Sequence, residues 1–84
     1  MMIKFSTRAW EDYLYWQSVD RSMLKRINQL IRDIERDPFA GIGKPEPLKH
    51  QLNGFWSRRI DSCHRLVYAL EGDVLLIAQC RDHY

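Results

Sequence analysis

One carboxylate of this chain stands on a stiff stretch of backbone. Glu46 lies between Pro45 and Pro47, and each proline fixes its own φ while the second also restricts the residue before it. A carboxylate presented in so few directions suits a general base, which must face one particular proton of a substrate. A rigid turn that happens to carry an acid explains the same three residues, so the local sequence leaves both interpretations open.

Arginines alternate with strand-forming residues further along the chain. Arg59 lies two residues from Ser57, and Arg65 lies two residues from Val67. Because side chains alternate along a strand, the two members of each pair point to the same face. Such arginines either guard a solvated sheet edge or bind phosphate oxygens with a planar fork that stays charged. From residue 44 to residue 65 five basic side chains outnumber two acidic ones, and the five are Lys44, Lys49, Arg58, Arg59 and Arg65.

A histidine and a tyrosine, His83 and Tyr84, are the last two residues of the sequence. They follow closely on Cys80, where a predicted apolar strand ends, so the strand can fix their position. Histidine donates and accepts protons near neutral pH, which suits a general acid. An exposed and frayed tail is the competing interpretation.

Together these groups match the requirements for cleaving RNA without a metal ion. One group removes the proton of a ribose 2′-hydroxyl, another protonates the departing 5′-oxygen, and cations stabilise the charge that builds on the phosphate. An aromatic ring can stack a splayed base. Because the nucleophile belongs to the substrate, no cofactor and no metal site are expected. Spacing alone does not establish that these residues converge in space.

Two helices are predicted in the first half of the chain, where they must support the later residues. The first covers about residues 7–17, with Ser6 or Thr7 as its side-chain cap. The second begins after Asp20 and carries six apolar residues on one face. It ends near the residue before Pro38, because proline disfavours helical geometry in its predecessor.

A change to alternating periodicity predicts strands in the second half of the chain. Together with a short N-terminal segment, the predicted strands are 2–5, 48–52, 55–60, 64–70 and 74–80. The last is apolar enough to be buried on both faces. The order of elements predicts an α+β fold, in which an N-terminal strand and two helices pack on one face of a mainly antiparallel sheet and leave the other face free.

Length, charge and cysteine content limit the functional classes. The 84 residues predict a single domain, 1–84, and a net charge of +2 excludes a uniformly basic protein held to nucleic acid by bulk charge. No apolar run is long enough for a membrane span, and no signal-peptide core is found. The two cysteines, Cys63 and Cys80, fit a reduced cytoplasmic protein. Zinc held by them with His64 and His83 is the less favoured alternative.

Several segments, taken in order, resemble one family of bacterial toxins. The resemblance runs essentially from end to end and rests on the segments Trp10–Trp16, Asn28–Ile31, Gly43–His50, Gly54–Ile60, His64–Tyr68 and His83–Tyr84. Each segment alone is a weak signal, whereas all of them in this order and at this length are specific. The chain resembles the YoeB toxins of the RelE superfamily, the ribonucleases of toxin–antitoxin systems.

The resemblance implies a RelE-like microbial-ribonuclease fold and an endoribonuclease that cuts mRNA at the codon in the A site of the 70S ribosome. It also implies a homodimer, a YefM-like antitoxin that neutralises the toxin, and operator DNA bound only through the antitoxin complex. Carried over by residue, Glu46 is expected as the general base, His83 as the general acid and Arg65 as the phosphate stabiliser. The residues expected to bind the RNA are Lys49, Arg59, Tyr84, Arg58 and Lys44.

One residue departs from the family pattern, because Asp82 stands where a tyrosine or glycine is expected before the final His-Tyr. Its negative charge is expected to weaken the approach of RNA slightly. Two other functions fit the sequence. A translation blocker could occupy the A site without cleaving, and it would need neither Glu46 nor His83. An inactive subunit could serve only antitoxin binding and DNA regulation, but the intact His83-Tyr84 pair disfavours this.

Overall fold

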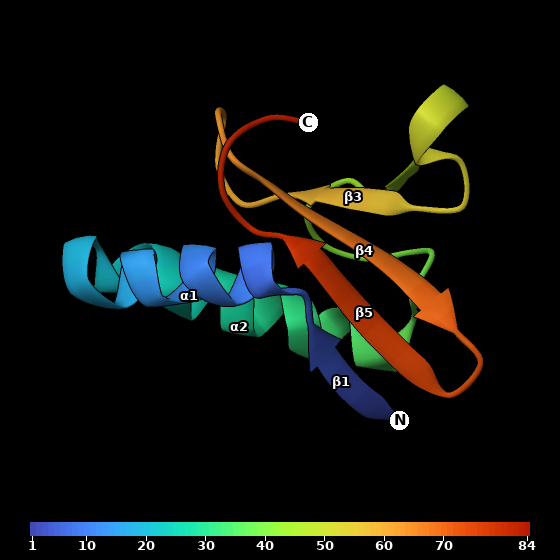
Figure 1. The fold of residues 1–84 in the computed structure, drawn as a ribbon, viewed down its shortest axis with the longest axis horizontal. Helices are drawn as coiled ribbons and strands as arrows, with labels where there is room; N and C mark the ends of the chain where they lie inside the picture. Colours follow the sequence, from blue (N-terminus) through green and yellow to red (C-terminus); the bar gives the residue numbers. More distant parts are fainter.

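The computed structural model describes all residues from 1 to 84 and places two helices against one face of a five-stranded sheet (Figure 1). Its elements are β1 (Met2–Phe5), α1 (Thr7–Val19), α2 (Arg21–Arg36), β2 (Glu46–Pro47), the 3₁₀ turn η1 (His50–Leu52), β3 (Trp56–Arg59), β4 (Arg65–Glu71) and β5 (Val74–Gln79). The strand order is β1-β5-β4-β3-β2. Only the pairing of β1 with β5 is parallel. The α+β prediction is confirmed, and β1 joins the sheet itself as an edge strand.

Both helices start at the caps that the sequence predicts. The Ser6 hydroxyl accepts a hydrogen bond from the Ala9 amide at 3.0 Å, and the Asp20 carboxylate accepts one from the Ser22 amide at 3.0 Å. Each cap satisfies an amide that the first helical turn leaves without a partner. The second helix ends at Arg36, as the proline that follows predicts, whereas the first runs two residues beyond its predicted end.

The core lies between the helices and one face of the sheet. Ile27, Leu30 and Ile34 project from α2 onto Leu66 of β4 and Ile77 of β5, and all five are fully buried. Because side chains alternate along a strand, the odd-numbered residues of β4 point to the other side. We call that second side of the sheet, opposite the helices, the open face.

The predicted strand 48–52 is wrong. Only Glu46 and Pro47 pair with β3, and the residues that follow form η1. His50 has φ of +59°, a left-handed conformation that cannot continue a strand. The apolar residue that suggested a strand has another role. Leu48 is a buried side chain, and its amide donates to the Phe55 carbonyl at 2.9 Å.

The strand buried on both faces is β4 rather than β5. Five consecutive residues of β4, from Arg65 to Ala69, are buried, whereas β5 alternates between buried and half-exposed positions. β4 is the middle strand of five and β5 lies next to the edge. The apolar sequence of β5 therefore does not mark the most enclosed strand.

The two cysteines occupy different environments. Cys63 is exposed in the turn before β4, and Cys80 is fully buried after β5. Burial, followed by the nearby Asp12 carboxylate, raises the pKa of the Cys80 thiol to about 12. Neither helix has the length and apolar character that crossing a membrane requires.

Candidate active site

The sheet register brings the predicted base and the predicted arginines to the open face. Glu46 of β2 pairs with Ser57 of β3, and Ser57 pairs with Val67 of β4. Arg59 and Arg65 pair directly with each other in the same two strands. Paired residues of neighbouring strands project to the same face, and these five alternate with the residues that contact the helices. Around this pairing the open face therefore carries the exposed Glu46 carboxylate and two guanidinium groups.

The last residues of the chain fold back toward this face, so that the C-terminus lies near β3 (Figure 1). The Gln79 side-chain amide donates to the carbonyls of Arg81 and Asp82, at 2.9 and 3.3 Å. The Ser57 hydroxyl then donates to the Tyr84 hydroxyl at 3.4 Å. Because Ser57 is also the pairing partner of Glu46, Tyr84 and Glu46 both neighbour the same residue of β3.

The predicted acid is held beside this tyrosine. The rings of His83 and Tyr84 lie with their centroids 4.6 Å apart, and the imidazole Nδ1 is 3.1 Å from the Tyr84 carbonyl oxygen. Both side chains are exposed. The structure thus brings Glu46, Arg59, Arg65, His83 and Tyr84 to one region, although they come from four separate segments.

One side of α1 holds the start of the segment that carries these two residues. Arg8, Asp12 and Trp16 are spaced four residues apart and share that side. The Asp12 carboxylate accepts from the Cys80 amide at 3.1 Å, and the Trp16 indole donates to the Cys80 carbonyl at 2.9 Å. The Arg8 guanidinium donates to the Arg81 carbonyl at 3.0 Å. A helix near the start of the chain therefore fixes where the last residues lie.

Arg65 is only 8% exposed, yet part of its guanidinium is free. Its Nη1 donates to the carbonyls of Asp61 and His64, at 2.9 and 3.1 Å. Nε and Nη2 have no protein partner, and no buried polar side-chain atom in the molecule is without one. These two nitrogens therefore reach solvent, and they form a fixed fork of the kind that binds a phosphate group.

Arg58 does not belong to this region, so the prediction that it binds RNA is wrong. It pairs with Leu66, which places it on the face that contacts the helices, and its side chain is 0% exposed. Its guanidinium donates to the Asp33 carboxylate at 2.5 Å and to the Tyr68 hydroxyl at 3.2 Å. Adjacent residues of a strand point to opposite faces, and this rule separates Arg58 from Arg59.

The buried arginine anchors the loop that leads to Glu46. Its guanidinium also donates to the carbonyls of Asp37, Ala40 and Ile42. The Asp33 carboxylate accepts from the Ile42 amide at 2.9 Å. This amide, followed by the guanidinium groups of Arg36 and Arg58, lowers the pKa of Asp33 to about 2. Sequence reasoning missed this anchor. Its only signal was that Arg58 directly precedes Arg59 in a strand and therefore points to the opposite face.

The remaining predicted residues, Lys44 and Lys49, flank Glu46 along the chain. Both are exposed, and neither side chain has a hydrogen bond or an ion pair within the protein. Just before them, Gly43 adopts φ of +78°, and its carbonyl accepts from the Arg59 amide at 2.6 Å. A Cβ at this position would lie 2.8 Å from Leu30, so the tight approach of this loop to α2 requires glycine.

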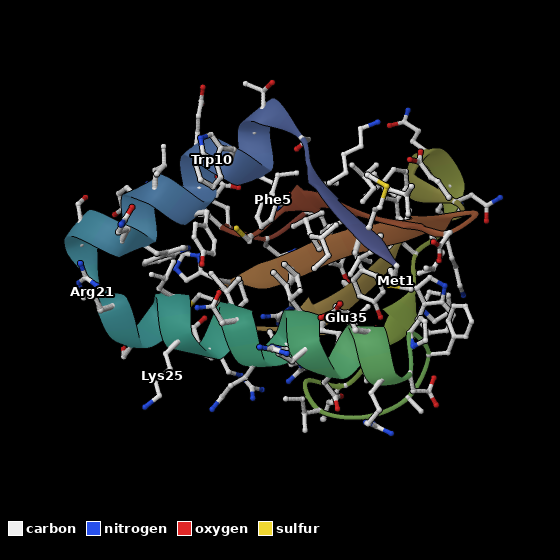
Figure 2. The ribbon with its side chains drawn as sticks, turned by 90° about the horizontal axis from the view of Figure 1, so that it is seen from below. Met1, Phe5, Trp10, Arg21, Lys25 and Glu35 are labelled. Carbon is white, nitrogen blue, oxygen red and sulfur yellow. The ribbon has the colours of Figure 1, made fainter.

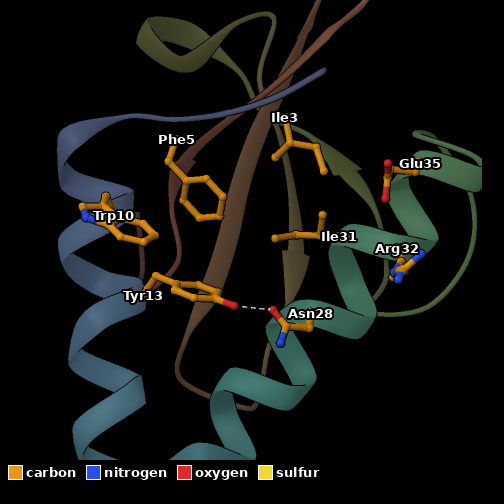
Figure 3. A pocket seen from close by; sticks show the side chains of 8 residues that line it. All are labelled: Ile3, Phe5, Trp10, Tyr13, Asn28, Ile31, Arg32 and Glu35. Carbon is orange, nitrogen blue, oxygen red and sulfur yellow. Dashed lines mark hydrogen bonds between the residues drawn. The ribbon is translucent and has the colours of Figure 1, made fainter. Parts of the chain in front are cut away.

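A groove of about 500 Å³ lies elsewhere, between β1, α1 and α2. Figure 3 shows Phe5, Trp10 and Tyr13 on one side of it, with a hydrogen bond of 2.8 Å from the Tyr13 hydroxyl to the side chain of Asn28. Trp10 and Phe5 also appear together in Figure 2, where α1 meets β1. Ile3, Ile31, Arg32 and Glu35 complete the lining. None of the predicted site residues borders this groove.

No group of three or more histidine, cysteine, aspartate or glutamate side chains is arranged to hold a metal ion. The zinc site considered as an alternative in the sequence does not form such a group, and its residues are Cys63, His64, Cys80 and His83.

The fold of this chain is shared with a known class of proteins. The fold matches that of the RelBE2 toxin–antitoxin complex from Mycobacterium tuberculosis, with a TM-score of 0.73 at 21% identity over 98% of this chain and 96% of that one. At this identity the match shows the fold alone, which is that of RelE-like toxins. The RelE-like architecture expected from the sequence is confirmed.

A narrower assignment follows from the sequence matches. Residues 5–84 match the family described as the YoeB-like toxin of bacterial type II toxin–antitoxin systems. Toxin YoeB of Escherichia coli K12 is 61% identical over 84 residues, covering 100% of both chains. This chain belongs to the YoeB-like toxin family.

Solved structures of that family agree closely. The YoeB/ParE toxin from Agrobacterium tumefaciens has a TM-score of 0.98 at 49% identity, with 100% of both chains covered. A YoeB dimer and a heterotetrameric YoeB–YefM complex from Staphylococcus aureus have TM-scores of 0.93 and 0.92, both at 48% identity over 100% of this chain and 98% of theirs.

Proposed function

We propose that this toxin is a ribosome-dependent endoribonuclease, which cleaves mRNA in the ribosomal A site and so inhibits translation. One observation carries the proposal: Glu46, Arg59, Arg65 and the His83–Tyr84 pair converge on the open face of the sheet. They are an acid–base pair and two cations beside an aromatic ring, which is the set of groups that cleavage of a ribose phosphodiester requires.

In the proposed reaction the 2′-oxygen of the substrate attacks the adjacent phosphorus and the bond to the 5′-oxygen breaks. A cyclic phosphate and a free 5′-hydroxyl result. Glu46 takes the proton of the 2′-hydroxyl, and its exposure on a proline-bracketed backbone supports this role. His83 gives a proton to the 5′-oxygen. A ribose hydroxyl is a far weaker acid than a carboxylic acid, so positioning must supply much of the rate.

Cations stabilise the phosphate in this reaction. Arg65 is the main one, because its free Nε and Nη2 are held in place by the two bonds of Nη1. Arg59 pairs with it directly and adds a second positive charge. Lys44 and Lys49 are exposed on either side of the base and bind the RNA backbone. The Tyr84 ring orients a base by stacking.

The proposed chemistry is independent of metal ions, because the attacking oxygen belongs to the substrate and both protons are transferred by side chains. A target on the 70S ribosome places the protein in the cytoplasm. The ribosome supplies part of the RNA groove, which accounts for a site that lies on the face of a sheet.

We further propose that a YefM-like antitoxin neutralises the toxin and that operator DNA is bound only through their complex. The S. aureus homologue supports the first part, since its structure was solved as a YoeB–YefM complex.

The S. aureus dimer supports self-association. We propose that this chain self-associates through the groove between β1 and α1, where Ile3 and Trp10 are 42% and 49% exposed. An apolar surface of this kind is costly to leave in water and favours a second copy.

Primer extension on mRNA from arrested cells, and on mRNA in a purified system with and without ribosomes, tests the function. We expect discrete cuts within codons at ribosome positions and none without ribosomes. Glu46→Ala should abolish the cuts, whereas Glu71→Ala, an exposed acid in β4, should leave them unchanged.

The competing outcome is growth arrest without any cuts. It would replace cleavage by steric blocking of the A site, and arrest would then persist in a folded Glu46→Ala variant.

A further inference from the structure

The segment that follows β5 has no regular secondary structure, yet one of its residues is fixed through both backbone groups. The Asp82 amide donates to the Nδ1 atom of His64 at 2.8 Å. The Asp82 carbonyl accepts from the Arg65 amide at 3.0 Å. Asp82 also has φ of +67°, in the left-handed region that is uncommon for residues other than glycine but is tolerated by aspartate. The residues attached to it are His83 and Tyr84.

We propose that His64 is a positioning residue, whose unprotonated Nδ1 holds the segment carrying His83 and Tyr84 over the open face and releases it when the ring is protonated. The inference rests on the proposed function for the roles of those two residues. Its geometric part, the contact of an imidazole with a backbone amide, stands independently of that function.

The direction of the hydrogen bond fixes the state of the ring. A backbone N–H can only donate, so Nδ1 must be the acceptor and the proton of the neutral ring must lie on Nε2. The ring is also held in its orientation. It packs edge-to-face on Trp16, with centroids 4.9 Å apart and planes at 80°. Trp16 is itself buried and bonded to the Cys80 carbonyl.

Charged groups of both signs surround this imidazole. The Asp61 carboxylate accepts from the His64 amide at 2.7 Å, and the Asp82 carboxylate lies 3.5 Å from the Arg8 guanidinium of α1. The Arg65 guanidinium donates to the His64 carbonyl. Trp16, the residue of α1 that touches the ring, carries no charge.

Protonation changes this contact from attraction to repulsion. A protonated ring carries hydrogen on both nitrogens, so Nδ1–H would face the amide N–H of Asp82. Histidine side chains change charge between roughly pH 5 and 8. The bond is therefore made by the neutral ring and is lost when the ring is protonated.

Two substitutions of His64 separate the acceptor from the titration. His64→Asn keeps an acceptor near the Nδ1 position but does not titrate, and His64→Leu keeps an apolar side chain without an acceptor. His50→Asn is the matched control, because His50 is exposed in η1. Each variant is prepared as the full chain and compared with the wild type.

Amide hydrogen exchange of Asp82, measured by NMR, reports the contact without reference to activity. We expect protection in the wild type and in His64→Asn near pH 8, and about tenfold less in His64→Leu, the usual effect of one lost hydrogen bond. Towards pH 5 the protection should fall in the wild type and persist in His64→Asn. Equal protection in all variants at all pH values would overturn the proposal.

Single-turnover cleavage of ribosome-bound mRNA over the same pH range is the second readout. His64→Leu should be about tenfold slower than the wild type near pH 8, and His64→Asn should lose less activity than the wild type as the pH falls. Parallel pH profiles of wild type and His64→Asn would overturn the switch, even if His64→Leu fails to fold. If the wild type cleaves no RNA, the proposed function fails, and Asp82 exchange still decides the role of His64.

Discussion

The two sides of helix α1 serve two different surfaces of the molecule. On one side, Asp12 and Trp16 hold the backbone of Cys80 through directional hydrogen bonds. On the other, Trp10 and Tyr13 stack with centroids 5.9 Å apart and line the apolar groove. Hydrogen bonds fix atoms to within tenths of an ångström, whereas apolar contacts tolerate small shifts. The first side suits positioning of reactive groups and the second suits association.

The same contrast separates the open face from the groove. The reactive groups lie on a sheet surface without a deep pocket, while the hollow of the molecule carries none of them. A binding site that encloses its ligand is normally concave. The open face therefore suits a large substrate presented by another surface, in agreement with the proposed action on the ribosome.

Arg58→Met tests the division between the two faces of the sheet most strongly. It removes a buried charge that bonds Asp33, Tyr68 and three carbonyls. We expect the free energy of unfolding to fall by about 3–5 kcal/mol, measured by urea denaturation.

Arg59→Met is the matched control for that substitution. It changes the neighbouring residue on the open face, and its effect on stability should stay within about 0.5 kcal/mol. Equal losses in the two variants would contradict the assignment of the arginines to different faces.

Arg65→Ala should slow cleavage strongly without abolishing it. Losing a fixed cation at the phosphate should lower the single-turnover rate by about 10²–10³-fold. Circular dichroism checks that the variant is folded. Arg32→Ala in the groove is the control and should cleave normally. A folded Arg65→Ala variant with the wild-type rate would remove this residue from phosphate stabilisation.

Trp10→Ala tests the groove as a self-association surface. Truncating a large aromatic residue at an interface should weaken the dimer by about 1–3 kcal/mol, or roughly 5- to 150-fold in dissociation constant. Sedimentation equilibrium measures this. Leu14→Ala is the control, because Leu14 is a similarly exposed residue of α1 outside the groove, and its dimerisation should be unchanged.

The pH dependence of stability should show the smallest effect. The pKa of Asp33 is lowered from 3.8 to about 2 in the folded protein, so its ionised form stabilises the fold above pH 3.8 and this contribution is lost as the pH falls toward 2. Asp33→Asn should lower the thermal unfolding midpoint near neutral pH by less than Arg58→Met does. Its difference from the wild type should shrink through the acid range. A constant difference at all pH values would show that ionisation of Asp33 is not what stabilises the loop.

Most of the fold could be predicted from local signals. Ser6, Asp20 and Pro38 marked the helix ends through their own chemistry. Alternation marked β3 and β4, and a near-continuous apolar run marked β5. The error at 48–52 arose because the backbone of His50, not its side chain, breaks the strand. Alternation of apolar residues carries no information about φ.

The candidate site could be predicted only in part. The alternation of side chains along a strand correctly grouped Arg59 with Ser57. The same rule applied to Arg58 would have excluded it from the open face. The position of His83 and Tyr84 could not be predicted, because it depends on contacts such as Trp16 with Cys80, which are 64 residues apart. Periodicity describes single elements, whereas such contacts depend on how complete elements pack.

The parallel pairing of β1 with β5 has a consequence for the order of folding. β3, β4 and β5 are joined by short turns, so their contacts are local and can form early. β1 contacts no other strand than β5, through pairs such as Met2 with Val74, and these contacts must close a loop spanning nearly the whole sequence. We therefore expect β1 to be placed last, so that the groove, which takes one wall from Ile3 and Phe5, forms only after the sheet that carries the candidate site is assembled.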